Sequence, residues 1–241
     1  MTDTIPTAAP EPGLLARAIG ILTSPRKTYE AVVQHPRPVG ILFLCVLVIA
    51  LATGLPQFTE SGRQAVLDMQ IQQVEKFTGQ PASDEMYAQM QARSKYSAYF
   101  TIASIFIASP IIAMIIAGIY WFVFNVIMGG TAVFKQVLAV VTHSMVVGAV
   151  GVILGAPIQY LKGTMSSQGP FTLAALVPTL DEKSFLVGFL GFINPFTIWG
   201  IVVVAIGLGV LYKRNTTTIA TTLLILYGLF AAGVATFLST R

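Results

Sequence analysis

Charged residues are scarce in this chain of 241 residues. They make up 10 % of it, whereas 55 % of the residues are apolar, and a soluble domain usually carries about 25 % charged residues. So few charges cannot cover so much apolar surface in water, which indicates a lipid environment. The net charge of +4 does not indicate nucleic-acid binding, because the basic residues stand beside apolar runs, as membrane topology signals do.

Cysteine pairs and catalytic motifs are also missing. The one cysteine, Cys45, lies in an apolar run, which excludes an intrachain disulfide and favours a small buried side chain. The sequence holds no HExxH, GxSxG or Walker A motif, and no Cys/His spacing that fits a metal. No Asp or Glu lies in an apolar run, so pump-type carboxylates are absent. We therefore expect no catalytic residue, metal or cofactor, and no enzyme activity.

Five long runs carry no charge at all. They cover residues 38–59, 96–134, 136–161, 184–212 and 215–240, and each exceeds the roughly 20 residues that cross a bilayer. The sequence therefore predicts an all-α polytopic membrane bundle of about five transmembrane helices, near residues 39–55, 98–128, 136–161, 196–211 and 216–238. Four or six spans remain alternatives, because the first run is short and Pro195 divides the fourth. Pro110 predicts a kink in the second helix.

The segment before the first run divides into a tail and an amphipathic part. Residues 1–12 are rich in Pro, Ala and Thr and are expected to be a disordered tail. The first apolar run begins near residue 38, too late for a cleaved signal peptide. Residues 13–37 repeat apolar side chains at helical spacing, and Ser24-Pro25 restarts the pattern. We expect interfacial amphipathic helices there, followed by a membrane domain over 38–241.

Residues 58–97 form the longest segment between predicted spans. Leu67, Ile71 and Val74 repeat at i, i+4 and i+7, and Ser83 can cap a second helix after the break at 78–81. The pattern predicts a helical hairpin. About 40 residues are too few for an enzyme domain.

Five spans place the two termini on opposite sides of the membrane. Seven Lys or Arg fall on each side of the membrane, so their number does not decide the orientation. If the N-terminus is inside, the seven inside residues stand closest to the spans, where the positive-inside rule acts most strongly. We expect the N-terminus in the cytoplasm, and the C-terminus and the hairpin outside it. The candidate cytoplasmic docking residues are Arg26, Lys27, Lys135, Lys213 and Arg214.

Polar side chains inside the spans are costly and mark candidate sites. The sequence has Asn125 in the second span, Thr142, His143 and Ser144 in the third, and Asn194 just before the fourth, and of these Asn125, His143 and Asn194 are the candidate site residues. One interpretation is a midplane site that relays protons or binds a head group. The other is that these groups hydrogen-bond neighbouring helices. Gly151 and Gly155 form a GxxxG pattern, which fits packing within the chain and also a homo-oligomer.

Short motifs carry a resemblance to a known family. They are Ser24-Pro25-Arg26 with Tyr29, Gly129-Gly130-Thr131 before Phe134-Lys135-Gln136, and Asn194-Pro195-Phe196 before Trp199 and Gly207. The chain resembles the Yip-one domain (Ypt-interacting-protein) family over about residues 14–238. It departs from the family at Val146-Val147-Gly148, where members often have a proline, and in the long hairpin at 58–97.

The resemblance implies five spans with a cytosolic N-terminus. Eukaryotic members are associated with Rab-type small GTPases and vesicle traffic, whereas bacterial members lack an assigned activity as a class. Without a long acidic or Pro-rich tail, this chain is more similar to a bacterial inner-membrane member. We expect a non-enzymatic membrane scaffold or adaptor in membrane organisation or trafficking, embedded in the lipid bilayer and binding a protein partner at its cytoplasmic face. The alternative is a transporter or lipid-handling protein with a midplane site.

Overall fold

The computed structural model describes residues 13–162, 169–177, 179–181 and 184–240. The predicted tail at 1–12 lies outside these residues. Helices dominate the described part of the chain, which contains no strand. Five of the helices are long and apolar enough to cross a membrane, and this confirms the predicted polytopic helical bundle. They are α3 (Pro38–Gly54) continued by η1 (Leu55–Phe58), α6 (Ser97–Trp121) continued by η2 (Phe122–Ile127), α7 (Phe134–Lys162), α9 (Pro195–Tyr212) and α10 (Thr216–Ser239).

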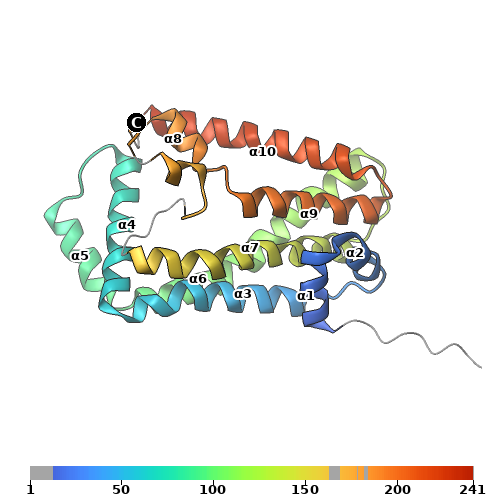
Figure 1. Ribbon diagram of the computed structural model, residues 1–241, viewed down its shortest axis with the longest axis horizontal. Helices are drawn as coiled ribbons and strands as arrows, with labels where there is room; N and C mark the ends of the chain where they lie inside the picture. Colours follow the sequence, from blue (N-terminus) through green and yellow to red (C-terminus); the bar gives the residue numbers. More distant parts are fainter. Residues whose placement is uncertain (1–12, 163–168, 178, 182–183, 241) are drawn as a thin grey trace, which may run out of the picture.

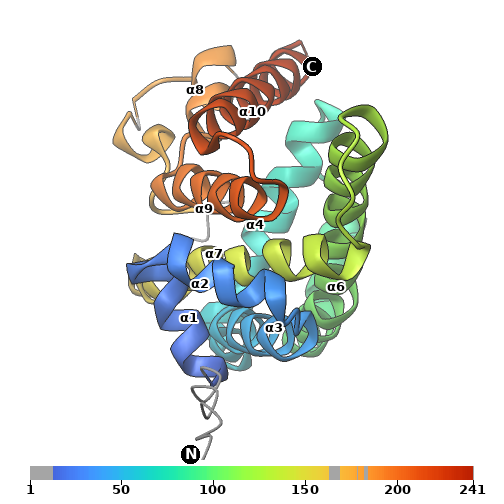
Figure 2. The same ribbon diagram turned by 90° about the vertical axis from the view of Figure 1, so that its right-hand side faces the viewer.

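The long helices extend between two ends of the molecule (Figure 1). One end, here called the α2 end, holds α1 (Leu14–Thr23), α2 (Pro25–Gln34) and the turns that join α6 to α7 and α9 to α10. The other, the α5 end, holds α4 (Glu60–Thr78), α5 (Asp84–Ser94), α8 (Phe185–Leu190) and the C-terminus. Seen along the bundle, α7 lies between α3 and α9, and α10 packs on α9 from outside (Figure 2).

Helix α7 is the core of the bundle. Of its most apolar window, 56 % is buried, against 11 % for α6 and for α10. Apart from His143, the side chains that it buries are small or β-branched, among them Val137, Ala139, Val140 and Val147. Such residues let neighbouring helices approach closely. Helices α6 and α10 instead direct large apolar side chains outward, including Ile115 and Leu229, as a lipid-facing surface requires.

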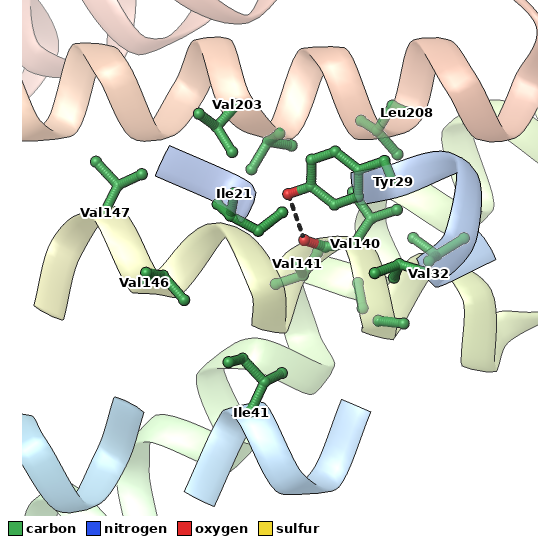
Figure 3. Close-up of a cluster of buried hydrophobic side chains, with 14 of the residues drawn as sticks. Ile21, Tyr29, Val32, Ile41, Val140, Val141, Val146, Val147, Val203 and Leu208 are labelled. Atoms are coloured by element: carbon green, nitrogen blue, oxygen red, sulfur yellow. Dashed lines mark hydrogen bonds between the residues drawn. The ribbon is translucent and has the colours of Figure 1, made fainter. Parts of the chain in front are cut away.

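The segment before α3 holds the two helices α1 and α2, and one of them enters the bundle. Tyr29 and Val32 of α2 are completely buried, and α2 packs against both α7 and α9 (Figure 3). The Tyr29 hydroxyl donates a hydrogen bond to the backbone oxygen of Val140, 3.2 Å away. Helix α1 keeps an outward apolar face, since Leu15 and Ile19 are 67 % and 61 % exposed. Helix α2 therefore anchors this end to the bundle, whereas α1 presents an apolar face to the surroundings.

The hairpin at the α5 end begins and ends at recognisable caps. The Thr59 hydroxyl accepts from the N–H of Gly62, and the Ser83 hydroxyl accepts from the N–H of Met86, as the sequence predicted for α5. Helix α4 ends at Gly79, whose φ of 71° suits glycine. Leu67 of α4 is buried, whereas α5 buries no residue at all. The second helix of the hairpin therefore adds little to the core.

Pro110 and Pro195 are two of the prolines in the long apolar runs. Helix α6 runs without a break across Pro110, and its irregular turn comes later, as the π-helix η2. Such single turns are frequent at functional sites. Pro195 takes the first position of α9, after the short helix α8, so it divides the fourth charge-free run as the sequence indicated.

Candidate functional site

The polar residues in the middle of α7 bond mainly to their own helix. The hydroxyl of Thr142 donates to the oxygen of Ala139 at 3.2 Å, and that of Ser144 to the oxygen of Val141 at 2.6 Å. His143 is 1 % exposed, and its Nδ1 lies 2.7 Å from the oxygen of Ala139. Its Nε2 has no hydrogen-bond partner in the described part of the chain. These groups sit within packed helices, where local bonds offset most of the cost of burial.

The two asparagines stabilise helix ends. Asn125 donates from Nδ2 to the oxygen of Ala132, and the indole N–H of Trp121 donates to the same oxygen at 3.0 Å. These bonds fasten the turn between α6 and α7. Asn194 accepts from the N–H of Phe196 at 2.9 Å and thereby caps α9. Both amide groups therefore bond at a helix end, while Oδ1 of Asn125 is buried without a hydrogen-bond partner among the described residues.

The structure does not bring Asn125, His143 and Asn194 together. Tyr212, at the end of α9, stacks on Phe124 with ring centroids 4.8 Å apart. Asn125 is therefore near the end of α9, whereas Asn194 caps its start, and the 18 residues between span about 27 Å. A midplane transport site would need these side chains to converge, so the geometry does not favour the transporter alternative.

The candidate basic residues, in contrast, all lie at the α2 end. Arg26 and Lys27 occupy the first turn of α2, Lys135 the first turn of α7, and Lys213 and Arg214 the turn between α9 and α10 (Figure 1). All five are exposed. Only Arg26 is near a carboxylate of the described residues, at 3.9 Å from Glu30 along the same helix.

Charge is distributed unequally between the two ends. Among the described residues, the α2 end has one acid, Glu30, against seven basic residues: Arg17, Arg26, Lys27, Arg37, Lys135, Lys213 and Arg214. The α5 end has six acids and five basic residues, which are Glu60, Asp68, Glu75, Asp84, Glu85 and Asp181 with Arg63, Lys76, Arg93, Lys95 and Lys162. The seven basic residues of the α2 end are the same seven that the sequence count assigned to one side of the membrane.

Side-chain hydrogen bonds to backbone oxygens tie the segments at the α2 end to one another. Gln136 of α7 donates from Nε2 to the oxygen of Val33 in α2, at 2.9 Å, and its Oε1 accepts from the N–H of Val133. Arg214 donates from Nη2 to the oxygen of Met128 at 3.3 Å, which connects the α9–α10 turn to the end of α6. These segments therefore form one surface.

A groove of about 470 Å³ lies between the two turns of this surface, and is called the turn groove below. No acidic residue lines it; its lining consists of Phe124, Gly129, Gly130, Thr131, Ala132, Gln136, Leu211, Tyr212, Lys213 and Arg214. The hydroxyl of Tyr212 is buried and has no hydrogen-bond partner among the described residues. Sequence reasoning marked several of these residues but missed the groove, because their proximity depends on how α6 and α9 pack.

The family comparison covers nearly all of this architecture. The sequence model of the Yip1 domain matches residues 19–238, from α1 to the end of α10. The chain belongs to the Yip1 domain family. The resemblance noted from the sequence motifs is therefore confirmed, and the five apolar helices make this Yip1 domain an integral membrane protein. No curated protein and no solved structure matches the chain.

The motifs that carried the resemblance have structural explanations in this Yip1 domain. Pro25 takes the first position of α2, and Tyr29 enters the core four residues later. Gly129 has a φ of 71°, which a side chain would strain. A Cβ on Gly207 would lie 2.6 Å from Cγ1 of Val140 and 2.9 Å from Cζ of Tyr29. These positions therefore shape the fold, and the exposed basic residues are left as the candidates for binding.

Proposed function

We propose that this protein is a non-enzymatic membrane scaffold that binds a protein partner through the basic surface of its α2 end. The observation that carries the proposal is the placement of five exposed basic residues, from three separate segments, on one end that has a single acid among the described residues. Complementary charge steers association and selects partners, so the partner is expected to present an acidic surface.

The surface has the rigidity that a docking site needs. Tyr29 fixes α2 in the core through Val140, Gln136 fixes α2 to the start of α7, and Arg214 joins the two turns. A partner would meet basic side chains on a preformed backbone, which limits the entropy lost on binding. Membership in the Yip1 domain family is consistent with a role in membrane organisation or trafficking.

The same charges support an orientation. With the α2 end in the cytoplasm, the basic end obeys the positive-inside rule, and α4 and α5 lie on the extracytoplasmic side. The N-terminus is then cytoplasmic and the C-terminus extracytoplasmic. The compartment rests on the resemblance to bacterial members of the family, from which we propose a bacterial inner membrane.

Affinity purification from solubilised membranes tests the scaffold proposal. The test variant replaces Arg26, Lys27, Lys135 and Arg214 with Gln and Lys213 with Asn, because Asn tolerates the left-handed backbone of that position. The control variant replaces Arg63, Lys76, Arg93 and Lys95 of the α5 end with Gln. We expect the test variant to lose about tenfold or more of its co-purifying proteins, since several charge-assisted contacts disappear together, and the control to keep them.

Removing basic residues can also reverse membrane topology, so the orientation of both variants is checked by thiol labelling before the comparison. A correctly oriented test variant that retains its partners in full would refute the scaffold proposal. Equal losses in both variants would show that partner binding depends on the net charge of the protein and not on the basic residues of the α2 end in particular.

A further inference from the structure

The turn groove lies where four membrane helices end. Helix η2 ends at Ile127, α7 begins at Phe134, α9 ends at Tyr212 and α10 begins at Thr216. The groove is lined by residues of the two turns between these ends and by residues in the adjoining ends of η2, α7 and α9. Since the apolar helices lie in the hydrocarbon layer, the groove stands at the level of the lipid head groups. Phosphate groups are concentrated at this level.

The lining of the groove offers donors and positive charge, and no carboxylate competes with an anion. Lys213 and Arg214 supply two charges. No described residue accepts a hydrogen bond from the backbone N–H of Thr131 or Ala132. The buried hydroxyl of Tyr212 also lacks a partner in the described structure. Phosphate oxygens accept strong bonds from such groups, strongest from the charged ones.

Lys213 occupies a position where lysine is unusual. It has a φ of 53° and is the one described residue other than glycine with a positive φ. Its N–H bonds to the oxygen of Gly209 and ends α9, a role that glycine or asparagine usually fills. The left-handed conformation costs a residue with a Cβ about 1 kcal/mol or more. A cost of this size points to a use for the side chain, which stands beside the groove.

We infer that the turn groove binds a phosphate group, held by Lys213, Arg214 and the backbone of the Gly129–Ala132 turn. The phosphate of an anionic membrane lipid and a free phosphate share this chemistry. The inference goes beyond the scaffold proposal, because it concerns a small anion in a groove and requires no protein partner. Arg26 and Lys27 do not line the groove, so this pair of charges offers a matched control.

Native mass spectrometry of the full chain tests the inference. The protein is released from nanodiscs of phosphatidylcholine and phosphatidylglycerol, and the bound phospholipid is counted. The pair variant Lys213→Asn/Arg214→Gln is expected to retain phosphatidylglycerol about tenfold less than the wild type, because two charge-assisted contacts are lost. The control Arg26→Gln/Lys27→Gln, which removes the same charge from the same end, is expected to retain it fully. Tyr212→Phe is expected to weaken retention about threefold.

A second arm identifies the source of the phosphate. Wild-type protein in lipid-free detergent is titrated with inorganic phosphate, and binding is followed by the same method. Binding here that the pair variant loses, with no retained phospholipid, assigns the groove to a free phosphate. Retained phospholipid without phosphate binding assigns it to a head group. If the pair variant matches the wild type in both arms, or if the control loses as much as the pair, the inference is wrong. Partner capture can fail without affecting either arm, so the scaffold proposal and the phosphate site are judged separately.

Discussion

Gly207 of α9 lies in close contact with Tyr29 of the N-terminal helix α2. Gly207 leaves no room for a Cβ beside Val140 and Tyr29. We predict that Gly207→Ala destabilises the protein by a net 1 kcal/mol or more, on the order of overpacked cores, despite the better helix propensity of alanine. Gly200, in the same helix, has open space where a Cβ would stand, so Gly200→Ala is the control and should be neutral or slightly stabilising. Thermal unfolding in detergent measures both, and equal stability of the two variants would contradict the prediction.

The phenol of Tyr29 makes stability depend on alkaline pH. Burial raises the pKa of Tyr29 above its ordinary value of 10.0, so the neutral form is favoured in the folded protein. The contribution of Tyr29 to the free energy of unfolding is therefore fully present below about pH 10. It is lost as the pH rises above that value, at up to about 1.4 kcal/mol per pH unit. We predict that near neutral pH the free energy of unfolding of the wild type exceeds that of Tyr29→Phe by about 1 kcal/mol, because of the hydrogen bond to Val140.

Unfolding midpoints of wild type and Tyr29→Phe are compared from about pH 8 to about pH 11. The lead of the wild type should shrink above pH 10 and then reverse, because phenylalanine cannot ionise. The other tyrosines are common to both proteins and cancel in the difference. Two curves that stay parallel over the whole range would show that Tyr29 is not buried as the structure places it.

At the scale of helices, the inner and outer faces of α6 are expected to tolerate larger side chains differently. Ala117 of α6 is completely buried on the face toward the bundle, whereas Ala103 of the same helix is exposed. We predict that Ala117→Leu lowers the free energy of unfolding by about 1–3 kcal/mol, as extra methylenes do in packed cores. Ala103→Leu adds the same atoms on the outward face and should change it little. A destabilising Ala103→Leu would mean that α6 has a packed neighbour on its outer face.

The elements that the sequence predicts well are those set by local composition. Charge-free runs identify the long helices, because a charge in the hydrocarbon layer is too costly to tolerate. The entry of α2 between α7 and α9 was not predicted: the spacing of Tyr29 and Val32 shows an apolar face, but it cannot show whether lipid or protein covers it. The GxxxG pattern likewise did not show whether its partner lies in the same chain. Gly151 lies against Phe196, and Gly155 against Pro170 and Phe171, so contacts within the chain use these glycines. Gly228 of α10, in contrast, has open space beside it.

At the scale of the whole molecule, alternation of the spans predicts which segments share an end, and not which ones touch. The sequence assigned Lys135, Lys213 and Arg214 to the side of the N-terminus because each follows an even number of predicted spans. It could not predict the bond from Arg214 to Met128 or the groove between the turns, since these depend on the packing of Phe124 against Tyr212. The separation of Asn125 from Asn194 follows from the predicted spans, because Asn125 stands near the end of the second span and Asn194 just before the start of the fourth.

The unequal charge of the two ends leads to the last prediction, which is the orientation of the whole bundle. Cys45 is the one cysteine and is buried, so a Cys45→Ala background permits single exposed thiols at either end. Arg26→Cys reports on the α2 end and Gln89→Cys on α5, since both positions are exposed. In intact cells a membrane-impermeant maleimide should label position 89 and spare position 26, which should react only after the inner membrane is opened. The reverse pattern would place the acid-poor basic end outside, against the positive-inside rule. It would also remove the cytoplasmic partner from the scaffold proposal, while leaving the helix packing unchanged.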